Sequence, residues 1–397
     1  MNDIWLACHA PLDSNSGKHV LAVANELGRR GNSVIACAPE HASENVKIEN
    51  GVKFYTFAEL VNGAKKTPPD LIHIWTPREK MRELYRSICK QFAAEIPYIV
   101  HREDNEMIIL ADQMRISLDE IEEVRRGLRK LEVPGHLTHP AYGSQMLASA
   151  SGVTALIESL TVNLPEGLPH KVFAPGFDPI FSTPVLNAGR IVRDRYRISS
   201  KTFLVTYTGN VHDSNVAEVR SLYLAIALAN RMGTPVRLLR TGSDCAQLDD
   251  HGVEELRKHE INLGFVPRND LPLLIHAADL LIQPGAVDDW NAQRFPSKLP
   301  EFLASGRPVM LPKVNLGTFL QNGVNAIVLE KANAQAITTG LLEWLPRKDC
   351  LQKIGAEGRA FAEKYLKWSK AVDRIDELYR RILERPLSVK KADKESN

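Results

Sequence analysis

The segment with the clearest chemical meaning is residues 294–310, RFPSKLPEFLASGRPVM. Its apolar residues repeat with helical spacing directly after Ser297 and Lys298, and Gly306 stands where such a helix would end. Free backbone N–H groups at a helix N-terminus favour an anion. One turn further in, the carboxylate of Glu301 can accept hydrogen bonds from vicinal hydroxyls such as those of a ribose. The segment predicts a nucleoside diphosphate site. A capping serine, a solvated lysine and a surface glutamate are the ordinary alternative.

Short apolar runs that alternate with helical patterns must position this segment, and they are typical of parallel sheets covered by helices. In the first half of the chain the predicted strands are residues 4–8, 33–38, 52–56, 71–75, 98–101 and 153–158. In the second half they are residues 203–208, 236–240, 261–263, 280–283, 309–311 and 326–329. Two such series predict an α/β protein with two Rossmann-like domains.

The predicted boundary between the domains lies in a segment rich in proline and glycine, HKVFAPGFDPIFSTPVLNAGR at residues 170–190. We assign residues 1–180 to the first domain and residues 181–365 to the second. Residues 366–397 form a helix and a polar tail, because helical periodicity continues to residue 384 and SVKKADKESN is too polar to pack. We expect this helix to return to the first domain.

Composition excludes several classes of protein. The chain has 397 residues, enough for two cores, and its formal net charge of +2 does not favour a nucleic-acid surface. Its five cysteines are scattered, which argues against a disulfide framework or a structural zinc site. No stretch resembles a signal peptide or a membrane span. We therefore expect a soluble, cytoplasmic protein.

A charged segment without strand character follows the fifth predicted strand, at residues 103–141. Ser117 and Glu120 have the spacing of a capping box, and acidic residues precede basic ones as the helix dipole favours. The basic residues are Arg125, Arg126, Arg129 and Lys130. They form either a solvated helix face or a patch that attracts an anionic acceptor or lipid headgroups, which would give peripheral membrane contact.

The order of motifs along nearly the whole chain resembles the GT-B glycosyltransferases of family 4, the glycosyl transferases group 1 type. The first matching pieces are residues 14–17, the following HVLAVANELGRRGNSVIACAPE, and HKVFAPGFDPIF. The later ones are FLVTYTGNV, RLLRTGSD, INLGFVPRNDLPLLIHAADLLIQP and RFPSKLPEFLASGRPVM. No single piece is specific, but the ordered set is.

This resemblance implies two Rossmann-like domains whose parallel sheets face each other across a cleft, with a C-terminal helix that crosses back to the first domain. The first domain would hold the acceptor, and the second would bind a UDP- or GDP-sugar. The sugar would pass to a glycan, a lipid-linked acceptor or a small molecule, with retention of configuration and without a metal or other cofactor. Such enzymes stabilise the departing diphosphate with cations and helix N-termini.

In the second domain the resemblance assigns donor-binding roles to specific residues. Glu301 would bind the ribose, Lys298 with Ser297 and Arg294 the diphosphate, and Phe265 with Val266 would frame the base. The loop residues that let the backbone approach the phosphates would be Gly209, Asn210, Thr241 and Gly242. A tight turn needs the same glycines, and a phenylalanine at a strand end is often part of the core.

In the first domain the resemblance places Gly17 at the diphosphate, with Asn15 and Ser16 facing the acceptor. His101, at the carboxyl end of a predicted strand, would lie near the transferred sugar. Glu103 and Asp104 would orient an acceptor hydroxyl. Each assignment has an alternative. Gly17 and its neighbours could simply start a helix, His101 could be a core or surface histidine, and Glu103 and Asp104 could be charged loop residues without a ligand.

The sequence departs from the family pattern at two places. Gln293 stands where relatives carry the first of two glutamates, so that a catalytic position keeps its hydrogen-bonding capacity but loses its charge. The loop GNVHDSNVAEV has Asn210 and Asn215 where relatives carry an arginine and a lysine. We expect Lys298 and Arg294 to supply the missing charge. A catalytically silent partner subunit and a nucleotide-sugar epimerase on the same fold are the alternative functions.

Overall fold

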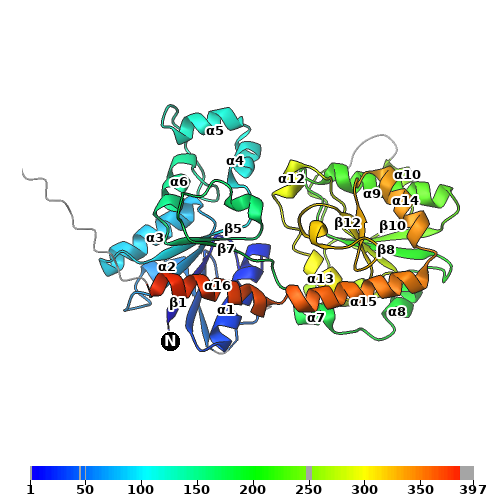
Figure 1. Ribbon diagram of the computed structural model, residues 1–397, viewed down its shortest axis with the longest axis horizontal. Coiled ribbons are helices and arrows are strands. Elements are labelled where there is room, and N and C mark those ends of the chain that lie inside the picture. The colour runs from blue at the N-terminus through cyan, green and yellow to red at the C-terminus, as the bar shows by residue number, and fades with distance from the viewer. Residues whose placement is uncertain (1, 44–45, 50, 247–252, 385–397) are drawn as a thin grey trace, which may run out of the picture. The chain divides into compact units, whose positions relative to one another are not determined.

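The computed structural model describes residues 2–43, 46–49, 51–246 and 253–384 (Figure 1). The chain forms two compact units, one made of Met1–Phe173 with Trp368–Asn397 and one made of Ala174–Lys367. The predicted boundaries, after residues 180 and 365, fall a few residues from these breaks. The polar tail predicted after residue 386 lies outside the described residues.

The sheet of the first unit is parallel throughout, in the order β3-β2-β1-β4-β5-β6-β7. Its strands are β1 (Asp3–Cys8), β2 (Ser33–Ala38), β3 (Val52–Thr56), β4 (Leu71–Trp75), β5 (Tyr98–Arg102), β6 (Gly152–Ala155) and β7 (His170–Val172). The six predicted strands are confirmed. The seventh, β7, was missed because it has only three residues and leads into the Pro- and Gly-rich segment.

Helices cover this sheet on both faces (Figure 1). They are α1 (Asn15–Arg29), α2 (Phe57–Val61), α3 (Glu79–Phe92), α4 (Glu106–Met114), α5 (Leu118–Arg125), α6 (Pro140–Ser149) and α16 (Trp368–Leu383), with a 3-10 turn at Glu158–Thr161. Helix α16 packs against α1, β6 and β7, so the C-terminal helix does return to the first unit. Tyr379 fixes it there, because its hydroxyl lies 2.8 Å from Nδ1 of the buried His73.

The sheet of the second unit is also parallel, in the order β10-β9-β8-β11-β12-β13. Its strands are β8 (Phe203–Thr208), β9 (Val236–Thr241), β10 (Glu260–Asn262), β11 (Leu280–Ile282), β12 (Val309–Pro312) and β13 (Ile327–Leu329). These match the six predicted strands within a residue or two. Each sheet reverses its strand order once, between β1 and β4 and between β8 and β11, and open α/β sheets bind ligands at the carboxyl ends of such strands.

The helices of the second unit surround that sheet. They are α7 (Pro179–Ser182), α8 (Ala188–Arg195), α9 (Val216–Arg231), α10 (Val253–Arg257), α11 (Leu271–Ala277), α12 (Asp289–Ala292), α13 (Leu299–Ala304), α14 (Ala334–Trp344) and α15 (Lys348–Tyr365). Two 3-10 turns lie at Arg268–Asp270 and Asn315–Phe319. The helical pattern that the sequence continues to residue 384 is interrupted after α15, where the carbonyl of Leu366 accepts a hydrogen bond from the Phe177 N–H (2.9 Å).

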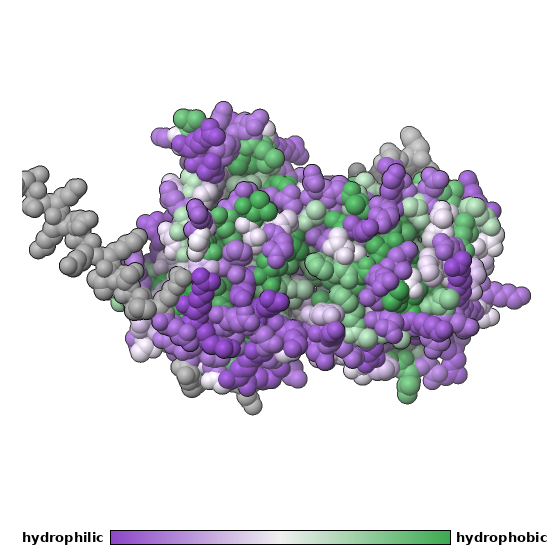
Figure 2. Space-filling model, viewed as in Figure 1, coloured by the Kyte–Doolittle hydropathy of each residue, from purple (hydrophilic) through white to green (hydrophobic). Residues whose placement is uncertain are grey.

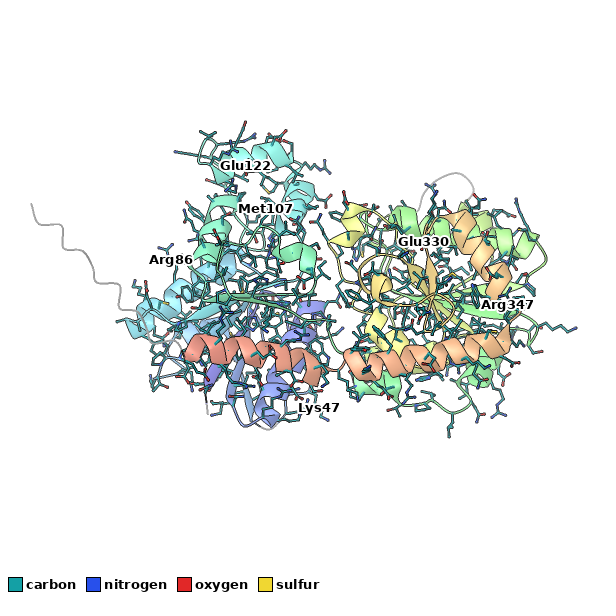
Figure 3. The ribbon with its side chains drawn as sticks, in the orientation of Figure 1. Lys47, Arg86, Met107, Glu122, Glu330 and Arg347 are labelled. Atoms are coloured by element: carbon teal, nitrogen blue, oxygen red, sulfur yellow. The ribbon has the colours of Figure 1, made fainter. Side chains whose placement is uncertain are left out.

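The charged segment of the first unit forms α5, where the predicted capping box between Ser117 and Glu120 is confirmed. Glu122, labelled in Figure 3, accepts hydrogen bonds from Arg125 (2.6 Å) and Arg126 (2.7 Å). Arg129 pairs with Glu120. The surface around α5 is mainly hydrophilic (Figure 2). Nearby acids thus offset much of the basic charge, as expected of a solvated helix face.

No helix among the described residues is both long and apolar enough to cross a bilayer.

Candidate functional site

The glycines predicted to approach phosphates lie together at the carboxyl end of the second sheet. The N–H of Gly209, after β8, donates to the carbonyl of Thr241, at the end of β9 (3.0 Å). A Cβ on Gly242 would lie 2.5 Å from the carbonyl oxygen of Gly209, and Gly242 has φ +104°. The two loops therefore touch through their backbones, and glycine is required at the contact.

Lys298 reaches this contact from α13. Its Nζ occupies the space that a Cβ on Gly209 would take, and it lies 4.7 Å from the ring centroid of Tyr207, on β8. The aromatic face attracts the ammonium and holds it at the strand end. An ammonium beside a half-buried glycine backbone is a suitable partner for a phosphate.

The helix that follows Lys298 contributes less to an anion site than the sequence predicts. Helix α13 has only six residues. The N–H of Leu299 already donates to the carbonyl of Pro296 (3.0 Å), and Pro300 has no N–H to offer. Ser297 makes no capping contact, because the residue at the N-cap is Lys298, without a side-chain cap. The lysine ammonium is therefore a stronger candidate for binding an anion than the N-terminus of this helix.

A second cation, Arg294, lies near the far end of the loop after β8, the loop that Lys298 contacts at Gly209. Arg294 stacks over the ring of Trp290, 5.2 Å from its centroid, and its Nη1 lies 3.5 Å from the carbonyl oxygen of Ser214. Gln293 ends α12, and its amide donates to the carbonyl of Asp289 (3.3 Å). Lys298 and Arg294 thus lie at the two ends of the loop after β8, and their role in place of its missing basic pair stays a prediction.

The two asparagines of that loop shape its backbone. The side-chain oxygen of Asn210 accepts a hydrogen bond from the N–H of Ser243 (2.8 Å), in the loop after β9. Asn215 accepts from the N–H of His212 (2.8 Å) and donates to the carbonyl of Asn210 (3.1 Å). These bonds hold the loop in one conformation.

Glu301 forms an ion pair that the sequence did not predict. Its carboxylate accepts a hydrogen bond from Arg268 (2.6 Å), and its side chain is 16% exposed. Arg268 also contacts Asp178 (3.3 Å) and stacks over the ring of Phe181, 4.9 Å from its centroid. The sequence around Arg268, PRND at residues 267–270, does not predict these ion pairs, because Asp178 and Glu301 are distant from it in the chain.

Phe265 is not part of the hydrophobic core, so the alternative reading of this residue as a core phenylalanine at a strand end is wrong. Its side chain is 79% exposed, directly after Gly264, which has φ +59°. The carbonyl of Gly264 accepts a hydrogen bond from the N–H of Gly242 (2.6 Å), which brings Phe265 next to the glycine contact. Val266 instead packs at the edge of a hydrophobic cluster.

The glycine contact leads to a prediction about Gly242. Replacing Gly242 with alanine should destabilise the second unit by about 2 kcal/mol more than replacing Gly233, because only the first Cβ meets backbone atoms. Gly233 is a matched control, with φ +87° and no atom near its Cβ position. Urea unfolding of both variants tests this, and equal losses of stability would contradict a close backbone contact.

In the first unit, the structure places His101 in the core. It is 0% exposed, stacks on Phe173 (5.1 Å between centroids) and Trp75 (4.2 Å), and its Nδ1 lies 2.8 Å from the hydroxyl of Thr154. Burial lowers the pKa of His101 to about 3 against the partly offsetting charge of Glu103, so the ring is neutral. This position matches the alternative of a core histidine, and the expectation that His101 lies near the transferred sugar stays a prediction.

The loop residues expected to face the acceptor differ in exposure. Asn15 is exposed, whereas Ser16 and Glu103 are hydrogen-bonded to each other, and Asp104 is half-buried. A Cβ on Gly17 would overlap the carbonyl oxygen of Pro11, so this glycine allows α1 to start close to the loop that follows β1. Asn15 remains the residue of this set that is best placed for a ligand.

Sequence reasoning missed three buried histidines of the first unit: His9 and His19 lie near Glu103, and His73 lies beside His101. His9, His19 and His73 are all buried, and burial lowers the pKa of His9 to about 4 and that of His73 well below its usual range. They lie in or after β1 and β4 or on α1, so the parallel sheet brings them together. Among the described residues, no group of three His, Cys, Asp or Glu side chains has the geometry of a metal site.

Comparison with known proteins finds a family likeness in part of the chain. Residues 202–346 match the family model described as glycosyl transferases group 1. The matched residues lie within the second unit and make up less than half of the chain. A search of curated protein sequences found no significant match.

Solved structures extend the assignment of the fold to the whole chain. Sucrose-phosphate synthase from Thermosynechococcus elongatus is 14% identical, with a TM-score of 0.70 over 97% of this chain and 100% of that one. HepE from Anabaena, in complex with UDP-glucose, is 16% identical, with a TM-score of 0.69 over 96% of this chain and 100% of that one. WaaG, a glycosyltransferase involved in lipopolysaccharide biosynthesis, is 15% identical, with a TM-score of 0.64 over 93% and 98%. These similarities show that the whole chain has the GT-B fold.

Proposed function

We propose that this glycosyltransferase transfers a sugar from a UDP- or GDP-sugar to an acceptor, with retention of configuration and without a metal. The observation that carries the proposal is the position of Lys298, whose ammonium lies against Gly209 where the loops after β8 and β9 meet. A diphosphate bound there would have glycine backbone on one side and a cation on the other.

The departing diphosphate gains negative charge as the bond from the sugar to oxygen breaks, so the site must stabilise charge that develops in the transition state. Lys298 and Arg294 supply two positive charges at the loop after β8. Gln293 would hydrogen-bond the sugar hydroxyls, without adding a negative charge near the cationic sugar ring. We propose that these cations take the role that a divalent metal has in other transferases.

The nucleoside would be recognised beside the same loops. The exposed ring of Phe265 offers a stacking face for the base, and Glu301 would accept hydrogen bonds from the ribose hydroxyls while Arg268 holds its carboxylate in place. HepE, with a similar fold, has been solved with UDP-glucose and with UDP, which supports a uridine nucleotide as the first donor to test.

The acceptor would bind to the first unit, where Asn15 is the exposed polar residue at the start of α1. A glycan, a lipid-linked oligosaccharide and a small molecule all offer the hydroxyl that the reaction needs. For a lipid-linked acceptor, Arg125 at the end of α5 and Arg126 and Arg129 after it would add peripheral contact with anionic headgroups, in exchange for their pairs with Glu122 and Glu120.

Donor hydrolysis tests the proposal without knowledge of the acceptor. The chain is incubated with UDP-glucose and other UDP- and GDP-sugars, and released nucleotide and the anomer of the free sugar are followed by NMR. We expect release of UDP or GDP, an initial product with the donor's configuration, and no loss of rate with EDTA. Nucleotide binding without any release would favour the silent subunit to which Gln293 also points.

A further inference from the structure

The carboxylate of Glu103 joins the start of α1 to the ends of two strands. Glu103 follows β5, is 9% exposed, and accepts hydrogen bonds from the hydroxyl of Ser16 and the Nδ1–H of His19 (3.0 Å), both in the first turns of α1. It also accepts from Nε1–H of Trp75, the last residue of β4 (3.0 Å). One buried side chain, at the end of β5, thus contacts α1 and β4 at the carboxyl end of the sheet.

These contacts leave little of the carboxylate for a ligand. A carboxylate has about four acceptor positions, and three are used by the protein's own donors. Burial would raise the pKa of Glu103, but the hydrogen bond from His19 and the nearby histidines outweigh it and hold the pKa well below its usual range. The group is therefore a permanent anion with satisfied hydrogen bonds, which suits a structural clamp better than a proton acceptor.

The first turn of α1 is also held from its other side. Ser14 caps the helix by accepting a hydrogen bond from the N–H of Gly17 (3.0 Å), and the missing Cβ of Gly17 lets the backbone lie against Pro11. The ring of His19 lies between Glu103 and Trp368, whose centroid is 5.4 Å away. The exposed Asn15 is thus carried on a turn whose neighbours on both sides are fixed.

We propose that Glu103 is a positioning residue for this turn, and not an acceptor ligand. Through Ser16 and His19 it sets where the backbone of residues 15–17 meets the substrate, so its effect on the reaction passes through α1. The effect of Glu103 on the reaction rests on the proposed function. Its role in holding the first turn of α1 does not.

The structural part is tested by hydrogen exchange. In Glu103→Gln the amides at the start of α1 should exchange about tenfold faster, because the turn opens locally when its clamp is weakened. Glu106→Gln is the matched control: Glu106 is equally buried and pairs with Arg78 (3.0 Å) and Thr138 (2.7 Å), neither of which lies on α1. Unchanged exchange at α1 in Glu103→Gln, or an equal increase in the control, would overturn the proposal.

The kinetic part is tested with the sugar nucleotide that the chain hydrolyses. Glu103→Gln should lower kcat about 10–100-fold, as misplacement of a substrate-contacting turn does, while the dissociation constant for the nucleoside diphosphate stays unchanged. Ser16→Ala, a milder change, should lower kcat less, and the double variant should lose no more than Glu103→Gln alone. A rise in KM with kcat unchanged, or additive losses, would overturn the role.

The two failures are distinguishable. If the proposed function is wrong, no sugar nucleotide is hydrolysed by the unaltered chain, yet the exchange experiment still decides whether Glu103 holds α1. If only this inference is wrong, the unaltered chain hydrolyses its donor and the Glu103→Gln variant shows the unchanged exchange described above.

Discussion

Acidifying the solution from about pH 7.5 to about pH 5 is expected to destabilise the first unit by up to ~6 kcal/mol. Three buried histidines stay neutral in the folded state, with the pKa of His9 at about 4, that of His101 at about 3 and that of His73 well below 6.5. In the unfolded chain they take up protons below about pH 6.5. The unfolded state therefore binds more protons, and stability falls as the pH is lowered.

Urea unfolding at several pH values measures this dependence. Each histidine contributes about 1.4 kcal/mol per pH unit between its unfolded and folded pKa, so His101→Phe should reduce the slope by about one third. His170→Phe, a change at an exposed histidine, is the matched control and should leave the slope unaltered. A stability that stays constant down to about pH 5 would show that these histidines are protonated in the folded chain.

Lys298→Met is expected to weaken the binding of a nucleoside diphosphate about 10–100-fold, because a hydrogen bond to a charged group contributes about 1.5–3 kcal/mol. The affinity for the nucleoside alone should change little, since Lys298 lies at the glycine contact that we assign to the phosphates. Isothermal titration with UDP and with uridine, or with GDP and guanosine, separates the two effects.

A control for this variant exists in the same unit. Lys313 is an exposed lysine paired with Glu330 (2.7 Å), so Lys313→Met removes a charge without touching the loops after β8 and β9. Equal affinities of Lys298→Met and the unaltered chain for the diphosphate would remove Lys298 from the phosphate site. Equal losses for diphosphate and nucleoside would point to a general disturbance of the second unit.

The fold was predictable because its signals are local. Buried parallel strands are continuous apolar runs, so all the strands longer than three residues, such as β1 and β8, were predicted at or near their observed bounds. The break between α15 and α16 was not predicted, because the helical pattern of apolar residues continues across residues 366 and 367. Tertiary contacts within each unit decide where those helices end, and such contacts cannot be predicted from a short stretch of sequence.

The site was predictable only in part, for the same physical reason. Gly209 and Gly242 were found because a missing side chain is visible in the sequence. The ion-pair partner of Glu301 was not predicted, because Arg268 is 33 residues away in the chain. His101 shows the limit most clearly: a strand end predicts a histidine near a ligand, but the rings of Phe173 and Trp75 cover it.

The two asparagines after β8 show why a departure from a family pattern is hard to interpret. Asn210 and Asn215 look like the loss of two phosphate ligands when only the sequence is considered. In the folded chain they hydrogen-bond the loop backbone, and Lys298 and Arg294 approach that loop from the segment between α12 and α13. If Lys298 and Arg294 bind the diphosphate, the positive charge of the site comes from a segment that is distant in sequence from this loop.

Calorimetric titration of the unaltered chain with UDP, GDP and ADP tests the central claim most directly. We predict saturable binding of UDP or GDP, weaker binding of ADP, and a rise in Tm of the second unit with nucleotide concentration. Absence of binding and of any rise in Tm with all three nucleotides at millimolar concentration would contradict a nucleotide-sugar site at the loops after β8 and β9.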